Sequence, residues 1–253
     1  MSDIQLFGFI CGTVTMKKKA AIDDGVGYIT LPIPAYLVTH PKGNVLFDTG
    51  LHADLLSPES GRLGALARYN EIAFEPGQHI LAQLAKLNLG PSDIAYVVNS
   101  HLHYDHAGGN SCFPNATMLV QRAEWEAAHD PELMVRNAFN PLDYDVGRIV
   151  CIEGRHDVHG DGAIEIFPSY GHTPGHQCLL VRTSDRRIVL SGDACYLTEN
   201  VERCMVSRLS YNVGQARDAL KYLADLQREG AELLIGHDPA QWSTLPRAPQ
   251  AIA

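Results

Sequence analysis

Six residues near the middle of the chain, His101-Leu-His103-Tyr-Asp105-His106, bring four metal-binding side chains close together. The apolar run before them, Ile94-Ala-Tyr-Val-Val98, predicts a buried strand. Because side chains alternate along an extended backbone, His101 and His103 point to the same side and can share one cation. Asp105 and His106 follow where the strand has ended, so they can face a second cation. Imidazole and carboxylate groups together suit zinc and its neighbours.

Three later segments each place another ligand-type side chain directly after a predicted strand, namely His172 after 163–167, Asp193 after 188–190 and His237 after 232–235. Polar side chains on loops at one edge of a rigid sheet commonly form binding and catalytic sites. We therefore expect these three side chains to extend the site that begins at His101.

The order of these segments resembles the metallo-β-lactamase superfamily: His-x-His-x-Asp-His, then His, then Asp, then His. Asp48-Thr-Gly50, after the predicted strand 45–47, matches the early Asp-bearing turn of that family. The resemblance extends from about Ile33 to His237 and implies an αββα sandwich, a layered α/β fold with the active site at one edge between two sheets. We expect one domain over residues 1–253, a length that suits a single α/β domain.

Seven ligand-type residues are too many for one tetrahedral zinc and suit two metals. The resemblance divides them into a first site, a second site and a bridge: His101, His103 and His172, then Asp105, His106 and His237, with Asp193 between the two. We expect two divalent ions, with zinc as the first choice and iron, cobalt or manganese as alternatives that accept the same donors.

Other polar residues near these motifs are expected to support the ligands. Asp48 should hydrogen-bond a ligand histidine and fix its tautomer, and His176 should be structural. The histidines that match no ligand position are expected at the surface or at caps: His40, His52, His79, His129, His156 and His159.

Tyr196, three residues after Asp193, narrows the resemblance to the N-acyl homoserine lactonases and the related γ-butyrolactone lactonases. In those enzymes this phenol contacts the substrate carbonyl or ring oxygen. The segments at 100–109, 113–116, 120–124 and 236–239 resemble the same enzymes. A tyrosine packed at a strand end is the structural alternative for this residue.

The resemblance implies a dinuclear-metal hydrolase that opens the ring of N-acyl homoserine lactones, a quorum-quenching reaction. A metal-bridging hydroxide would attack the carbonyl, which Tyr196 polarises, and Asp105 would carry the proton to the departing alkoxide. The alternatives are a γ-butyrolactone or other small-lactone hydrolase, then another dimetal esterase or a thioesterase of the glyoxalase II type. Two further classes fit the sequence less well. Flavodiiron proteins resemble this pattern but carry Glu where this chain has His103. A metal-binding module without catalysis does not need the complete ligand set that this chain has.

Composition excludes several other classes of partner. The formal charge of −9 argues against a nucleic-acid-binding protein, and the one basic run, Lys17–Lys19, fits a solvated hairpin tip. No stretch is long enough to span a bilayer. The six cysteines form no C-x-x-C pair, which fits reduced thiols in the cytoplasm. The expected partner is a small-molecule lactone; homodimers are common among the lactonases that the chain resembles.

The periodicity predicts most strands and two helices. The strands are at 4–10, 35–39, 44–47, 94–99, 163–168, 177–182, 187–190 and 232–235, and the helices are near 77–87 and 213–228, the second with a core stripe of Val213, Ala216, Leu220 and Leu223. The segments 52–74 and 129–157 lack periodicity and are candidates for lids. Their larger apolar residues are expected either in an acyl-chain pocket or in a satellite core: Leu63, Leu66, Tyr69, Phe74, Met134, Phe139, Leu142 and Tyr144.

Overall fold

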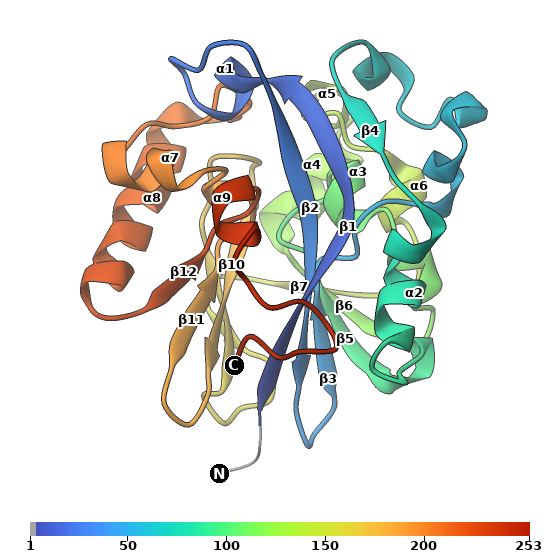
Figure 1. Cartoon of the computed structure of the whole chain (residues 1–253), viewed down its shortest axis with the longest axis vertical. Coiled ribbons are helices and arrows are strands. Elements are labelled where there is room, and N and C mark those ends of the chain that lie inside the picture. Colours follow the sequence, from blue (N-terminus) through green and yellow to red (C-terminus); the bar gives the residue numbers. More distant parts are fainter. Residues whose placement is uncertain (1–3) are drawn as a thin grey trace.

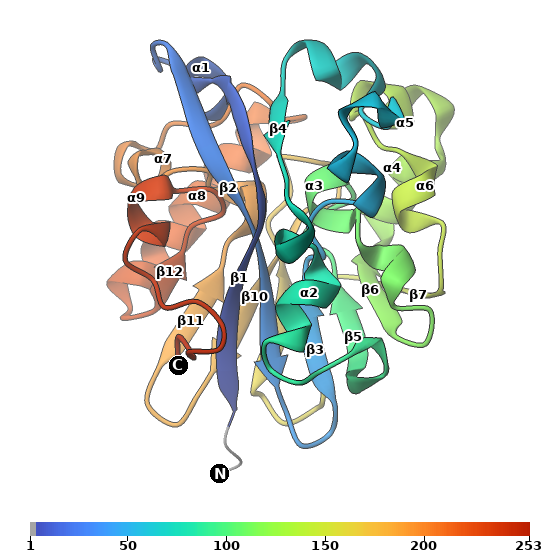
Figure 2. The ribbon, with the colours of Figure 1, turned by 45° about the vertical axis from the view of Figure 1, so that its right-hand side comes forward.

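Two β-sheets pack face to face, with helices on their outer faces, in a computed structural model that describes residues 4–253 (Figures 1 and 2). The larger sheet has the strand order β4-β1-β2-β3-β5-β6-β7, and the smaller sheet has the order β12-β11-β10-β9-β8. This arrangement confirms the αββα layering predicted from the sequence.

The larger sheet consists of β1 (Gln5–Lys17), β2 (Tyr28–Thr39), β3 (Asn44–Phe47), β4 (Glu71–Ala73), β5 (Ile94–Val98), β6 (Thr117–Gln121) and β7 (Arg148–Ile152). The smaller sheet consists of β8 (His156–Asp157), β9 (Ile164–Pro168), β10 (Gln177–Arg182), β11 (Arg187–Leu190) and β12 (Glu232–Leu234). The α-helices are α1 (Lys18–Ala21), α2 (Ile80–Ala85), α3 (Tyr104–Ala107), α4 (Arg122–His129), α5 (Pro131–Arg136), α6 (Pro141–Tyr144), α7 (Thr198–Arg203), α8 (Val213–Arg228) and α9 (Pro239–Trp242).

Alternation along the strands builds the layers. In β2, Tyr36 and Val38 face the second sheet, whereas Ala35 and Leu37 belong to the outer layer that α2 covers. On the far side, Leu220 and Leu223 of α8 pack on the outer face of the smaller sheet. The predicted stripe of α8 is therefore correct except at its first residue: Val213 begins the helix and is 47% exposed.

Parallel pairing brings the loops of the site to one end of the molecule. β3 runs parallel to β5, and β11 runs parallel to β12. Because parallel strands end at the same edge, the loops that follow them lie together. These loops carry Asp48, the segment 101–106, Asp193 and His237.

The N-terminal hairpin is longer than the sequence pattern predicts. The strand expected at 4–10 continues to Lys17, across an irregular register between Ile10 and Thr13. Figure 2 shows this hairpin extending past the rest of its sheet, with α1 at the tip. The basic residues 17–19 lie at that tip, as expected.

The two segments without periodicity contain short elements that the sequence did not reveal. The first holds three 3-10 turns and β4, which pairs with β1. The second holds α5, α6 and β7. No helix within residues 4–253 is long and apolar enough to cross a membrane, and the six cysteines are free thiols.

Candidate metal centre

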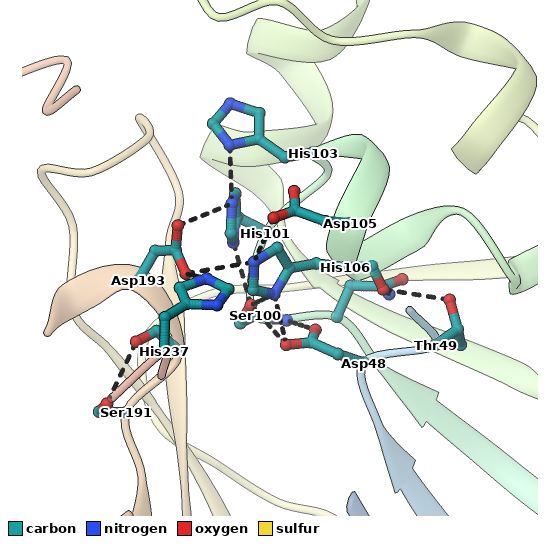
Figure 3. A network of polar contacts seen from close by, with 12 residues as sticks. Asp48, Thr49, Ser100, His101, His103, Asp105, His106, Ser191, Asp193 and His237 are labelled. Carbon is teal, nitrogen blue, oxygen red and sulfur yellow. Dashed lines mark hydrogen bonds and ion pairs between the residues drawn. The ribbon is translucent and has the colours of Figure 1, made fainter. Parts of the chain in front are cut away.

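The strand ends bring all seven predicted ligand residues together (Figure 3). They form two groups whose ligand atoms lie within 4.8 Å of one another: His101, His103, His172 and Asp193, then Asp105, His106 and His237. The histidines and Asp105 divide as the sequence resemblance implies, and Asp193, expected between the two sites, falls in the first group by distance.

The first group places three imidazole nitrogens against one another. His101 Nε2 lies 2.8 Å from His103 Nδ1, and His172 Nε2 lies 3.2 Å from both of these atoms. Nitrogens that coordinate one tetrahedral zinc at its usual bond length are about 3.3 Å apart. The spacing and the donor type therefore fit a single cation between the three rings.

In each imidazole ring, the contact made by the outward nitrogen indicates whether the inward nitrogen has a lone pair for a cation. His103 donates from Nε2 to the Asn137 carbonyl at 2.7 Å, which leaves Nδ1 unprotonated. His101 Nδ1 lies 3.0 Å from Ser100 Oγ, on the side of the ring away from His103. With His103 Nδ1 unprotonated and His101 Nε2 only 2.8 Å away, a cation between the two nitrogens would stabilise their close approach.

The Asp193 carboxylate lies between the two groups. Its Oδ2 faces His172 Nε2 at 3.4 Å, and its Oδ1 faces His237 Nε2 at 2.8 Å and His106 Nε2 at 3.1 Å. One side chain thus offers one oxygen to each group. Figure 3 shows one Asp193 oxygen in contact with His101 and the other in contact with His106 and His237.

The histidines of the second group are also oriented by their outer nitrogens. His237 Nδ1 lies 2.7 Å from the Pro32 carbonyl, and His106 Nδ1 lies 2.8 Å from Asp48 Oδ2. Each ring donates outward and turns Nε2 toward Asp193. The predicted hydrogen bond between Asp48 and one of these histidines is confirmed, with His106 as the donor.

Asp48 is held in an unusual backbone conformation to reach this position. Its φ is +60°, a region that non-glycine residues rarely adopt. Its carboxylate also accepts hydrogen bonds from the Ser100 N–H at 2.7 Å and from Ser100 Oγ at 2.9 Å. These bonds tie the loop after β3 to the histidine segment after β5.

Charges in the centre are strongly coupled. Burial raises the pKa of Asp193, but His237 and His106 outweigh it and hold that pKa well below its usual range. Burial lowers the pKa of His106, but the carboxylates of Asp193, Asp105 and Asp48 outweigh it and raise that pKa well above its usual range. Burial and the neighbouring histidines hold the pKa of His101 well below its usual range. Asp193 is thus ionised and His101 is neutral, as metal ligands must be, whereas His106 would release a proton on binding a cation.

Glu124 of α4 links the two loops that carry the first group. Its carboxylate accepts hydrogen bonds from the Leu102 N–H at 3.0 Å and from the Gly175 N–H at 2.8 Å. Leu102 separates His101 from His103, and Gly175 lies in the turn after His172. Sequence reasoning did not single out this glutamate for a role, because these two partners are backbone N–H groups.

His176 supports the loop of Asp193 rather than the ligand groups. Its Nε2 accepts a hydrogen bond from the Asp193 N–H at 3.0 Å, and its Nδ1 lies 2.7 Å from Ser169 Oγ. Both ring nitrogens are used, so the structural role predicted for His176 is confirmed. His52 caps a turn through Nδ1, also as predicted. Of the two positions expected for His40, the surface is wrong, because the side chain is buried against His159. The capping role is confirmed, because Nδ1 accepts a hydrogen bond from the Lys42 N–H.

A cavity of about 870 Å³ opens onto the centre. Five of the seven ligand residues reach it, and so does Tyr196, whose ring centroid lies 5.2 Å from that of His237. Burial and the Asp193 carboxylate raise the pKa of Tyr196 well above its usual range, so the phenol keeps its proton. The N-terminal hairpin forms part of the wall.

The apolar residues proposed for an acyl-chain pocket are divided between the cavity and the core. Leu66 and Tyr69 line the cavity. Phe139 and Tyr144 are buried in a separate cluster against α4, and Met134 packs on that cluster. Leu142 is 68% exposed. Tyr104, which the sequence did not single out, also lines the cavity, and its hydroxyl accepts a hydrogen bond from Asn70 at 3.1 Å.

The model of the metallo-beta-lactamase superfamily matches residues 29–229. N-acyl homoserine lactonase AttM from Rhizobium johnstonii is 34% identical, with 99% of each chain covered. N-acyl homoserine lactonase AiiA from Bacillus thuringiensis subsp. kurstaki is 31% identical, with 84% of each chain covered. A solved N-acyl homoserine lactone hydrolase, with the product N-hexanoyl-L-homoserine at its catalytic metal centre, is 26% identical. It has a TM-score of 0.88 and covers 99% of this chain and 100% of its own. The chain therefore belongs to the metallo-beta-lactamase superfamily and, within it, to the family of the N-acyl homoserine lactonases.

Proposed function

We propose that this protein is a metal-dependent hydrolase that opens the ring of N-acyl homoserine lactones. The observation that carries the proposal is the pair of ligand groups joined by Asp193 at the floor of a cavity, with the Tyr196 phenol beside them. The curated relatives, which align over most or all of the chain, are named N-acyl homoserine lactonases.

His101, His103 and His172 would hold one divalent cation, and Asp105, His106 and His237 a second, with Asp193 contributing an oxygen to each. The donor set of imidazoles and carboxylates suits zinc first, and iron, cobalt or manganese as well. Two bound cations supply Lewis acidity and a nucleophilic water at neutral pH.

The chain's own groups manage charge and protons around the lactone. The Tyr196 phenol, protonated because its pKa is raised, donates a hydrogen bond to the carbonyl oxygen as negative charge develops there. The Asp105 carboxylate, at the cavity wall, takes up the proton released as water adds and passes it to the ring oxygen as the ester bond breaks. The product is the N-acyl homoserine.

The size of the cavity favours an acyl-bearing lactone over γ-butyrolactone. A volume of about 870 Å³ lies at the upper end of the range for small-molecule sites. A bare five-membered ring would leave most of that space to water, whereas an acyl chain would bury its apolar surface against the wall.

Acid release at constant pH tests this function. Metal-loaded protein should hydrolyse N-hexanoyl and N-decanoyl homoserine lactone faster than γ-butyrolactone, a thioester or a phosphotriester, and chelation should abolish the reaction. A preference for γ-butyrolactone would instead indicate a small-lactone hydrolase. Hydrolysis of the thioester alone would contradict the proposal.

We also propose that the chain acts as one domain in the cytoplasm. Residues of both sheets, such as Val98 of β5 and Leu179 of β10, contribute to one interior layer, which supports a single folding unit. The six free thiols support a reducing compartment. A homodimer remains a prediction, which sedimentation of the metal-loaded protein tests.

A further inference from the structure

The mouth of the cavity is basic although the chain as a whole is acidic. The positively charged residues that line the cavity are Lys17, Lys19, Arg68, Arg136 and Arg208. Asp105 and Asp193 are the acidic residues that line it, and both belong to the ligand groups on its floor. In a chain with 29 acidic and 20 basic residues, this distribution produces a locally positive potential at the entrance.

Most of these cations have no carboxylate partner. Arg208 forms an ion pair with Asp23. Within residues 4–253, no carboxylate lies within ion-pairing distance of Lys17, Lys19, Arg68 or Arg136. Lys18, in contrast, lies between Lys17 and Lys19 outside the cavity lining and pairs with Glu199 at 3.0 Å. Within the described residues, four of the five cations that line the cavity are thus without a carboxylate partner.

Among the cations that line the cavity, Arg136 is connected to the first ligand group through its neighbours. The next residue, Asn137, accepts the hydrogen bond that orients His103. The Arg136 guanidinium lies 4.5 Å from the ring centroid of Tyr211, whose N–H donates to the His172 carbonyl at 2.9 Å. The stacked pair thus joins the segments that support two ligands of the first group.

Stacking leaves the edge of the Arg136 guanidinium available. An arginine that lies on an aromatic ring is preorganised, and its N–H groups can bind a carboxylate or phosphate with two parallel hydrogen bonds. A hydrocarbon acyl tail gains nothing from such a group. A substrate with an anionic oxygen group would pair with it and would also be attracted by Lys17, Lys19 and Arg68.

We propose that the preferred substrates are lactones whose acyl part ends in an anionic oxygen group, bound by Arg136. This inference rests on the proposed lactonase function and specifies its substrate class. It adds an electrostatic contact at the far end of the acyl part to the apolar contacts along the cavity.

Four homoserine lactones of equal acyl length test the proposal: one ending in a carboxylate, one in a phosphate ester, one in a primary amide and one in a methyl group. At low salt, kcat/KM for at least one anionic substrate should exceed that for the amide by about tenfold, equivalent to about 1.4 kcal/mol. The preference should shrink as ionic strength rises. The carboxylate and phosphate arms identify which anion the site prefers.

Arg136→Gln should lower the ratio of anionic to neutral kcat/KM about tenfold. Arg155→Gln is the matched control, because Arg155 also lies over aromatic rings, those of Phe167 and Tyr222, but outside the cavity lining. It removes the same charge and should leave the ratio unchanged. Far-ultraviolet circular dichroism and metal content show whether both variants are folded and loaded.

Two results would overturn the proposal alone: equal hydrolysis of the anionic and amide substrates by the unmodified protein, or an equal loss on all four substrates in Arg136→Gln. If the metal-loaded protein opened none of the lactones, the proposed function would fail and this inference with it.

Discussion

Two histidine clusters lie beyond opposite ends of β3, and they differ in what faces the ring nitrogens. Beyond its C-terminal end, Asp48 bonds His106, and the ligand groups follow. Beyond its N-terminal end, His40 stacks on His159 with ring centroids 4.0 Å apart. Both clusters hold imidazoles in contact, so contact between rings does not by itself distinguish a metal site from packing.

The His40 cluster is satisfied by the protein. His40 Nδ1 accepts a hydrogen bond from the Lys42 N–H at 3.1 Å, so Nε2 carries the proton and faces Asp161 at 3.1 Å. His159 Nε2 lies 3.0 Å from the Gly43 carbonyl. In the first ligand group, the inward nitrogens of three imidazole rings instead face one another. The comparison teaches that a metal site is recognised by lone pairs that converge with no donor of their own.

His103→Ala gives the largest expected effect and tests the comparison directly. Removing a nitrogen from the first group should release its metal and lower kcat/KM for N-hexanoyl homoserine lactone by at least about 10³-fold. Elemental analysis measures the metal content, and steady-state kinetics measure kcat/KM. His159→Ala, in the other cluster, is the control and should retain metal and activity. Loss of metal from His159→Ala would remove the distinction between the clusters.

Tyr196→Phe tests whether a residue beside the ligand groups can affect catalysis without affecting metal binding. The variant should keep its metal content, because the phenol is not among the converging donors, and should lower kcat about 10²-fold through loss of a donor to the carbonyl oxygen. Elemental analysis measures the metal content, and steady-state kinetics measure kcat. Unchanged kcat would assign Tyr196 to packing alone.

Glu124→Gln tests a residue that contacts the loops of the first ligand group and is not itself a ligand. An amide cannot accept from both the Leu102 and Gly175 N–H groups without turning its own NH₂ toward one of them. The first group should lose about 10- to 100-fold in metal affinity. Competitive chelation and the visible spectrum of the cobalt-loaded protein measure this loss. Glu126→Gln, exposed on the same helix, is the control. Equal metal affinity in both variants would contradict a positioning role for Glu124.

The pH dependence of stability gives a smaller effect. Burial raises the pKa of Glu124 from 4.5 to about 7. Between these values the unfolded chain has released a proton that the folded chain still binds. The free energy of unfolding should therefore fall as pH rises through this window, and Glu124→Gln should lack that part of the slope. Urea unfolding of the metal-free proteins from pH 4 to pH 8 measures the difference, and parallel curves would contradict the shift.

His40→Gln should have the smallest effect and should act on stability alone. Loss of the buried contact with Asp161 and of the ring stack should cost about 1 to 2 kcal/mol, with metal content and kcat/KM unchanged. Thermal unfolding alongside the kinetic assay measures both. A fall in activity with intact metal content would show that this cluster communicates with the ligand groups.

The ligand groups could be predicted from the sequence because each ligand follows an apolar strand. Alternation placed His101 beside His103, and the parallel strands then brought Asp193 and His237 to the same edge. The contacts that orient those ligands could not be predicted in the same way. The Asn137 and Pro32 carbonyls are backbone atoms, and any residue type could supply them.

Long-range packing also explains where a prediction was wrong or left two positions open. His40 is buried because His159, distant in the chain, covers it. Phe139 and Tyr144 have no visible periodicity, because Phe139 precedes α6 and α6 has only four residues, and their burial in the cluster with α4 comes from tertiary packing. The periodicity of apolar residues identifies the buried face of a long helix or strand. Neither His40 nor the pair Phe139 and Tyr144 lies in such an element.

The connection of the centre to both sheets has a consequence for biosynthesis. When the segment 101–106 leaves a ribosome, most of the smaller sheet has not been translated, and Asp193 and His237 are made only later. The nascent chain therefore exposes four ligand-type side chains without the carboxylate that joins the two groups. Cations captured at that stage would be held by an incomplete set, so the identity of the final metals depends on exchange after the second sheet has formed.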